Sequence, residues 1–177
     1  MSLTGKKVLL LVEQGYEELE FWYPKLRMLE EGAEVTVASR ETGIYHSKRG
    51  YPAKAEHAIR NLTPITFDAV IIPGGLKCPD LLRTSNAVLK FLQKSNELSK
   101  VIAFICHAAW VPISAGILEG RRATCYASIK DDVENAGGKY EYSSVVQDGN
   151  LISSRNPADL PDFCRTIISA LQRSTPA

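Results

Sequence analysis

Short hydrophobic runs alternate along the chain with longer segments of helical periodicity. The runs are bounded by polar residues, which is typical of strands buried on both faces of a sheet. We expect such strands at residues 7–12, 34–39, 68–72 and 101–105. The longer segments place apolar residues three and four positions apart, which indicates amphipathic helices. We expect helices at residues 17–31, 85–98, 107–118, 127–136 and 158–171.

Two other segments have the pattern of a β-hairpin. Residues 43–55 surround the polar turn Ser47-Lys48-Arg49-Gly50, and residues 145–152 surround an Asp-Gly pair, a strong turn signal. In the first helix, residues 17–31, the apolar positions are Leu19, Trp22, Leu26 and Leu29. Strands that alternate with helices predict a mostly parallel sheet covered by helices on both faces.

The chain is expected to form one domain, over residues 5–173. Its 177 residues suffice for a sizeable core, and no internal repeat or long linker divides them. In such sheets, ligands bind beyond the carboxyl ends of the strands. Three strand ends therefore matter for function, and they are residues 13–17, Gly74-Gly75 and Cys106-His107.

Composition excludes several classes of protein. Lys and Arg number 21 against 20 Asp and Glu, a balance that argues against a broad nucleic-acid-binding surface. The apolar runs are too short to span a membrane. The start of the chain lacks the apolar core of a signal peptide, so we expect a cytoplasmic protein.

The four cysteines have no spacing of the kind that zinc sites use. They are Cys78, Cys106, Cys125 and Cys164. In a reducing compartment free thiols are expected, and we predict neither a metal nor a cofactor. Cys125 and Cys164 have apolar or helical surroundings typical of packed thiols, whereas Cys78 lies in a segment expected to be an exposed loop.

Cys106 is the main candidate for reactivity. It follows a buried strand and precedes a helix, so the turn can direct the sulfur into a crevice and the helix start can favour a thiolate. The glycines of a nucleophile elbow are absent, and a cysteine at such a position is often only a small core residue. Adjacent residues at such a turn usually point apart, so the His107 amide is better placed than its ring to help.

The neighbouring strand ends offer partners for Cys106. Gly74 and Gly75 allow close approach of the backbone and present amide donors, although a tight turn explains them equally well. A carboxylate in the first turn of a helix usually compensates the helix dipole, but one that faces a crevice can stay protonated and donate to a thiolate. The residues alone leave four candidates open, and these are Glu13, Glu17, Glu18 and Glu20.

Several motifs together resemble the PfpI/ThiJ superfamily, most closely its PfpI branch of intracellular cysteine peptidase-like proteins. The matching stretches are Gly15-Tyr16-Glu17-Glu18-Leu19-Glu20, Tyr23-Pro24, Pro73-Gly74-Gly75, Pro79-Asp80, Ala103-Phe104-Ile105-Cys106-His107, Lys130-Asp131-Asp132, Asn135-Ala136-Gly137, Ser153-Ser154-Arg155 and Pro157-Ala158-Asp159-Leu160. The resemblance runs from Lys7 to about Leu171. It implies a flavodoxin-like α/β three-layer sandwich, similar to class I glutamine amidotransferases, that associates with copies of itself as a dimer or a larger homo-oligomer.

The resemblance also implies roles for individual residues. Cys106 would be the nucleophile, Glu17 the buried carboxyl that contacts it and lowers its pKa, and His107 the histidine of a triad. The amides of Gly75 and His107 would form an oxyanion hole next to Gly74. Tyr126 would line the site, and Asp80 would be the acid that orients the histidine of a neighbouring subunit.

The chain departs from the family pattern after the histidine. The family commonly has Gly-Pro and a polar residue there, whereas this chain has Ala108-Ala109-Trp110. The Trp110 indole is expected to narrow the pocket or to pack at a subunit contact. Substrate preference and assembly depend on which of the two it does.

Three functions are compatible with these residues. The first is a cysteine-dependent hydrolase or lyase, of glyoxalase, deglycase or peptidase type, in which a thiolate attacks a small carbonyl compound, its adduct or a peptide amide. The second is a redox sensor or stress-response protein, since the same thiolate oxidises readily. The third is a binding module, as in some transcription regulators of the superfamily, but no helix-turn-helix segment or basic patch supports it.

Overall fold

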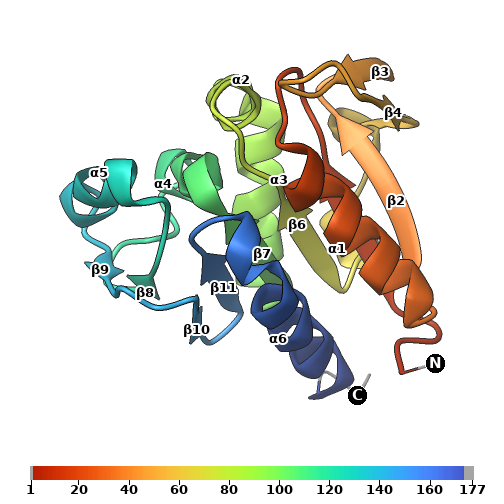
Figure 1. Ribbon diagram of the computed structural model, residues 1–177. Helices are drawn as coiled ribbons and strands as arrows, with labels where there is room; N and C mark the ends of the chain where they lie inside the picture. The colour runs from red at the N-terminus through yellow and green to blue at the C-terminus, as the bar shows by residue number, and fades with distance from the viewer. Residues whose placement is uncertain (1, 174–177) are drawn as a thin grey trace.

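A seven-stranded sheet forms the centre of the computed structural model, which describes residues 2–173 (Figure 1). The strands, in their order across the sheet, are β10 (Val145–Asp148), β11 (Leu151–Ser154), β7 (Val101–Ile105), β6 (Ala69–Ile72), β1 (Lys7–Leu11), β2 (Glu34–Ser39) and β5 (His57–Ala58). Every pair in this sheet is parallel except β10 and β11, which form the hairpin predicted around Asp148-Gly149.

Helices cover both faces of this sheet, as the alternating pattern predicted. The helices are α1 (Glu18–Glu30), α2 (Lys77–Leu82), α3 (Asn86–Glu97), α4 (Trp110–Ser114), α5 (Lys130–Asn135) and α6 (Leu160–Arg173). In Figure 1, α1 and α6 lie side by side in front of the sheet and α3 lies behind it. The expected three-layer α/β sandwich is therefore confirmed.

Two small ribbons extend from the sandwich. One is the predicted hairpin of β3 (Gly43–His46) and β4 (Pro52–Ala55), and the other pairs β8 (Arg122–Ala123) with β9 (Lys139–Tyr140). The strands β5, β8 and β9 were not predicted, because two residues are too few to show a period. Among the described residues no helix is long and apolar enough to cross a membrane.

Two sequence expectations about local structure were wrong. The helix expected over residues 107–118 is only α4, because residues 106–109 form a 3-10 turn and the left-handed Gly116 (φ 69°) follows the last turn. The segment around Cys78 is not an exposed loop but α2, in which the Cys78 side chain is fully buried. The segment over residues 127–136 also begins as a 3-10 turn before α5.

The register of the central strands brings the three functional strand ends together. Val8 of β1 lies beside Ala69 of β6, and Ile72 of β6 lies beside Phe104 of β7. These strands are almost entirely buried, since helices cover them on both sides. Their carboxyl ends therefore place the start of α1, Gly74-Gly75 and Cys106 at one edge of the sheet.

Candidate active site

Cys106 occupies a strained turn directly after β7. Its φ of 63° is left-handed, and only one other non-glycine residue of the described chain, Ser99, has a positive φ. Such a conformation costs a non-glycine residue roughly 1–3 kcal/mol, and it persists only where the surroundings enforce it. Strain of this kind is common at nucleophile turns, so the backbone supports the functional interpretation of Cys106 over a mere core position.

The Glu20 carboxyl lies beside Cys106, since a Cβ on Gly74 would lie 2.5 Å from Glu20 Oε2 and 2.8 Å from Cys106 Cβ. Each of the two groups shifts the pKa of the other. The Glu20 side chain is fully buried, and its Oε2 accepts a hydrogen bond from the Gly74 amide at 2.9 Å. Burial, and next the nearby Glu17 charge, raise the pKa of Glu20 to about 8. The carboxyl is therefore largely protonated at neutral pH and can donate its proton toward the sulfur.

The other three acids have different partners. Glu17, which the resemblance placed at the sulfur, is the N-cap of α1, where its Oε2 accepts from the Glu20 amide at 3.0 Å and its Oε1 lies 3.5 Å from Lys48 Nζ. Glu13 binds Arg40, with 2.6 Å between Oε2 and Nε, and Glu18 accepts from Ser47. Of the four candidates that the sequence left open, the geometry selects Glu20, and the contact expected for Glu17 is wrong.

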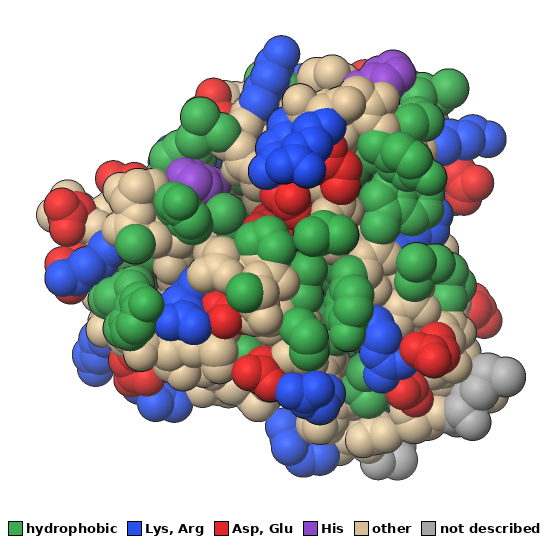
Figure 2. All heavy atoms as spheres, in the orientation of Figure 1, with side chains coloured by type: hydrophobic (Ala, Val, Ile, Leu, Met, Phe, Trp, Pro, Cys, Tyr) green, Lys and Arg blue, Asp and Glu red, His purple; other side chains and the backbone are tan. Residues whose placement is uncertain are grey.

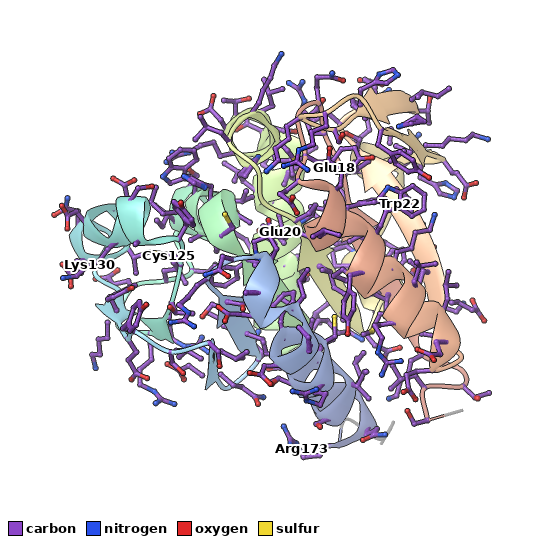
Figure 3. The ribbon with its side chains drawn as sticks, in the orientation of Figure 1. Glu18, Glu20, Trp22, Cys125, Lys130 and Arg173 are labelled. Carbon is purple, nitrogen blue, oxygen red and sulfur yellow. The ribbon has the colours of Figure 1, made fainter. Side chains whose placement is uncertain are left out.

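Figure 3 shows how α1 separates these side chains. Glu20 lies at the start of the helix on the side toward the middle of the molecule, whereas Trp22 points to the opposite side, toward β4. Glu20 shares its side of the helix with the buried Phe21, Pro24 and Met28. The acid therefore reaches the sulfur from within the buried face of α1.

The His107 ring contacts the sulfur, although adjacent residues at such a turn usually point apart. Its Nδ1 lies 3.3 Å from Cys106 Sγ. The left-handed backbone of Cys106 explains this contact, because it changes the direction of the sulfur relative to the next side chain. Burial lowers the pKa of His107, so the half-buried ring is neutral at pH 7 and able to accept a proton.

The backbone amides of His107 and Gly75 donate toward the Cys106 sulfur. Gly75 has a φ of 88°, and a Cβ there would lie 2.6 Å from the Gly15 carbonyl oxygen. At Gly74 a Cβ would lie 2.5 Å from Glu20 Oε2 and 2.8 Å from Cys106 Cβ. Both glycines are therefore required for the close packing of backbone around the sulfur, beyond a simple tight turn.

The environment of the sulfur favours the thiol in the resting protein. Burial raises the pKa of Cys106, and the charge of an ionised Glu20 raises it further, whereas the amides of His107 and Gly75 lower it. The side chain is only 7% exposed. A proton acceptor is therefore needed when the sulfur reacts, and the neutral His107 ring is in contact with it.

Aromatic residues enclose the His107 ring. Tyr126 stacks on it with ring centroids 4.9 Å apart, and Trp110 meets it edge-on at 5.2 Å. Trp110 is itself fixed by a 2.7 Å hydrogen bond from its Nε1 to Asp132. The expected lining residues thus lie at the site, and Trp110 borders it from α4.

Residues that the sequence did not single out also lie here. Ser128 Oγ is 3.3 Å from His107 Nε2, on the side opposite the sulfur. Asp80, by contrast, is exposed on α2 and makes no hydrogen bond or ion pair with His107 within residues 2–173. A single serine in a three-residue 3-10 turn carries no sequence signal of its own, which explains why Ser128 was not predicted.

Possible metal ligands do not gather in the described part of the chain. No group of three or more His, Cys, Asp or Glu side chains is placed to hold an ion there. All four cysteines are buried and free, which confirms the packed positions expected for Cys125 and Cys164. The groups that surround Cys106 are the His107 imidazole, the neutral Glu20 carboxyl and two backbone amides.

Comparison with known proteins agrees with the fold. Deglycase TK1284 of Thermococcus kodakarensis is 41% identical over 166 residues, covering 94% of this chain and 99% of the relative. General stress protein 18 of Bacillus subtilis is 34% identical, covering 96% and 99%. This chain also superimposes on the crystal structure of a two-domain protein from Anabaena variabilis, which contains DJ-1/ThiJ/PfpI-like and ferritin-like domains. The TM-score is 0.92 at 36% identity, and the match covers 97% of this chain and 52% of that longer one.

The family model extends over nearly the whole chain. The model of the DJ-1/PfpI family matches residues 6–170, which include β1, both glycines, the turn at Cys106 and most of α6. The match therefore contains every part of the site described above. The chain belongs to the DJ-1/PfpI family.

Proposed function

We propose that this protein is a cysteine-dependent enzyme of deglycase type that acts on small carbonyl compounds or their adducts. The observation that carries the proposal is the set of groups around Cys106. Cys106 has a strained backbone, and its thiol lies beside the neutral His107 imidazole, the protonated Glu20 carboxyl and two amide donors at the carboxyl ends of the strands. A packed core cysteine needs none of these partners.

The geometry supports a simple first step. As the sulfur attacks an electrophilic carbon, the thiol proton passes to His107 Nδ1, 3.3 Å away. The amides of Gly75 and His107, which donate toward the sulfur in the free protein, then stabilise the oxyanion that forms beside it. Glu20 supplies a neutral donor that adds no second negative charge to the site.

The names of relatives favour an adduct of a carbonyl compound over a peptide amide. Several curated relatives, including the one from Thermococcus kodakarensis, are named deglycases, and another, from Bacillus subtilis, is named a putative cysteine protease. The low exposure of Cys106 fits a small substrate better than a folded polypeptide. A peptidase activity on short amides is the runner-up.

An activity panel on matched variants tests this proposal. Methylglyoxal, a glycated thiol and a small peptide amide would each be offered to the wild type, to Cys106→Ala and to Cys164→Ala, which removes a buried thiol of α6 outside the site. We expect turnover of the carbonyl substrates, its loss in Cys106→Ala and its retention in Cys164→Ala. Full activity of Cys106→Ala would remove the proposal.

A second candidate function is a cysteine-based stress sensor. The same site favours it, because the Glu20 carboxyl and two backbone amides can donate hydrogen bonds to the sulfinate that oxidation of Cys106 would form. The relative named General stress protein 18 points the same way. Intact-mass measurement after mild peroxide separates the two, since a sensor oxidises at Cys106 before Cys125 or Cys164 and turns over no substrate.

We also infer that copies of the chain associate through α1. A groove of about 930 Å³ runs along this helix, lined on its apolar part by Leu19, Trp22, Leu26 and Tyr51. Leu19 and Leu26 are 56% and 59% exposed. Figure 2 shows hydrophobic side chains gathered over α1 and β4, with acidic and basic side chains at the start of the helix.

The charged end of the groove is self-complementary. Glu18 Oε1 accepts from Ser47 and from the Arg49 amide, whereas Glu18 Oε2 has no hydrogen-bond partner among the described residues. The exposed Arg49 guanidinium acts on this carboxyl through its charge, which helps to lower the pKa of Glu18. In a two-fold dimer each residue meets the same surface of a second copy, so Arg49 of one copy can pair with Glu18 of the other. The exposed Asp80 is available to a second copy as well, and its expected role toward His107 stays a prediction.

We propose that the protein is cytoplasmic. Four buried thiols without a disulfide in the described chain favour a reducing compartment. A free thiol at the reactive centre also needs such a compartment to stay reduced.

A further inference from the structure

The His107 imidazole has a neighbour at each ring nitrogen. Nδ1 lies 3.3 Å from Cys106 Sγ, and Nε2 lies 3.3 Å from Ser128 Oγ. Nucleophile and base pairs generally need a third group that orients the base from its far side. Ser128 stands at that place within the same chain, whereas Asp80 lies exposed on α2.

The turn that carries Ser128 is fixed relative to the nucleophile. The Tyr126 amide donates to the Cys106 carbonyl at 3.3 Å, and the Ile129 amide closes the turn by donating to the Tyr126 carbonyl at 3.0 Å. The Tyr126 ring stacks on His107 at an interplanar angle of 27°. A hydroxyl two residues further along is therefore held beside the ring by backbone and aromatic contacts together.

The opposite side of the ring is also closed. Trp110 meets His107 edge-on, and its indole is anchored to Asp132 on α5, the helix that directly follows the Ser128 turn. Rotation of the imidazole would break the stack, the edge contact and both polar contacts at once. The ring is thus held in one orientation, with Nδ1 at the sulfur and Nε2 at the hydroxyl.

We propose that Ser128 is a positioning residue: its hydroxyl accepts the Nε2–H of His107 and so holds the tautomer whose unprotonated Nδ1 faces the Cys106 thiol. The inference deepens the proposed function and rests on it. When the sulfur reacts, its S–H bond breaks, the proton forms an N–H bond at Nδ1, and the freed electron pair of sulfur forms the bond to the carbonyl carbon. The C=O π bond breaks at the same time, and its electron pair moves onto the oxygen. His107 becomes a cation whose Nε2–H still donates to Ser128, and no oxidant or reductant takes part.

The protonation states of the free site agree with this arrangement. Burial raises the pKa of the Cys106 thiol and lowers that of His107, so the proton stays on sulfur before reaction. A protonated thiol is a donor and requires an acceptor at Nδ1. A neutral ring with an acceptor at Nδ1 must carry its hydrogen on Nε2, where Ser128 can accept it.

Kinetics on three variants test the inference. Ser128→Ala removes the acceptor, Ser128→Thr keeps a hydroxyl, and Thr166→Ala removes a hydroxyl on α6 as a matched control. We expect kcat to fall roughly threefold to tenfold in Ser128→Ala with KM unchanged, as loss of one orienting hydrogen bond predicts. Ser128→Thr keeps the orienting hydrogen bond, so its kcat should lie within about twofold of the wild-type value. Thr166→Ala should leave kcat unchanged, because Thr166 lies outside the site.

A spectroscopic measurement separates orientation from general damage. In protein labelled with ¹⁵N-histidine, we expect the wild-type His107 ring to carry its hydrogen on Nε2 at pH 7 and Ser128→Ala to show a mixture of tautomers. A wild-type ring protonated on Nδ1, or an unchanged tautomer in Ser128→Ala, would overturn the inference. So would a larger loss of kcat in Asp80→Asn than in Ser128→Ala, because the acid of another subunit would then orient the ring.

The two proposals fail in different ways. If turnover survives in Cys106→Ala, the proposed function is lost, yet the tautomer measurement still decides whether Ser128 holds the ring. If turnover requires Cys106 but Ser128→Ala retains both the wild-type tautomer and the wild-type kcat, only the inference about Ser128 is wrong.

Discussion

At the scale of single residues, Glu20 combines two roles that oppose each other. As a neutral carboxyl it can donate to the sulfur, but keeping it neutral inside the protein weakens the fold at higher pH. Burial raises its pKa from 4.5 to about 8, so the unfolded chain ionises this group over a range in which the folded chain does not. The stability that it contributes is present below pH 4.5 and is lost as pH rises to about 8.

Replacement of Glu20 by glutamine should therefore stabilise the protein in a pH-dependent way. At pH 5 we expect Glu20→Gln and the wild type to unfold at similar urea concentrations. At pH 8 the variant should be more stable by roughly 3 kcal/mol, because glutamine does not ionise in either state. Urea denaturation at the two pH values checks this, with the exposed Glu97→Gln as control; a gap that does not grow with pH would contradict a buried neutral carboxyl.

Gly74→Ala should disturb the geometry of the site by adding one methyl group. Its Cβ would lie within 2.8 Å of the Ile105 carbonyl, besides the contacts with Glu20 and Cys106 described above. In Gly74→Ala the backbone must shift, so we expect kcat to fall by roughly 100-fold, as small displacements of reacting groups do. Gly116→Ala, outside the site and with open space around its Cβ, is the control. Its left-handed φ costs the variant stability, so kcat is compared per folded molecule, and equal kinetic losses in both variants would contradict this reason.

At the scale of elements, α1 shows how far the sequence could lead. Its existence and bounds were predicted to within a residue, but the apolar positions used for that prediction, Leu19, Leu26 and Leu29, are exposed. The helix has a second stripe, Phe21, Pro24 and Met28, which packs on the sheet. Periodicity shows that both stripes exist, and only tertiary packing decides which of them faces the sheet.

The same ambiguity explains the choice of the wrong glutamate. Glu17 and Glu20 are three positions apart and lie near each other on the helix, so spacing alone does not separate them. Glu20 precedes Pro24 by four positions and Met28 by eight, which aligns it with the buried stripe. The alignment of Glu20 with the buried stripe was therefore the sequence signal that could have identified it. The position of Ser128 depends on a 3-10 turn, which produces no periodic pattern in the sequence.

Glu17 should behave as a helix cap when it is replaced. In Glu17→Ala, α1 loses the acceptor for the Glu20 amide, and we expect a loss of about 0.5–2 kcal/mol in the free energy of unfolding, as for other N-caps. Glu17→Asp, which keeps a capping oxygen, should recover most of it. Activity per folded molecule should stay within about threefold of wild type, since no catalytic contact is lost. If a folded Glu17→Ala variant has no turnover, Glu17 and not Glu20 is the acid that acts on the Cys106 sulfur.

At the scale of the whole molecule, the exposed apolar stripe of α1, Leu19, Leu26 and Leu29, needs a cover. The sheet occupies one side of the helix, while the groove over Leu19 and Leu26 is open in the single chain. Exposed apolar patches of this size typically mark interaction surfaces. The groove ends at Glu17 and Glu18, one turn or less from Glu20, so an occupant of the groove would lie next to the site and link assembly to access.

Leu26→Glu should break this association without damage to the fold. The side chain is 59% exposed, so we expect a change in monomer stability within about 0.5 kcal/mol. A charge in the middle of the apolar groove must lose its hydration when a second copy binds, which opposes assembly. Sedimentation velocity over a range of concentrations should show an assembled wild type and a monomeric Leu26→Glu, while Ile65→Glu, at an exposed position on the 3-10 turn before β6, assembles like the wild type. A monomeric wild type, or equal losses in both variants, would show that the α1 groove is covered by something other than a second copy.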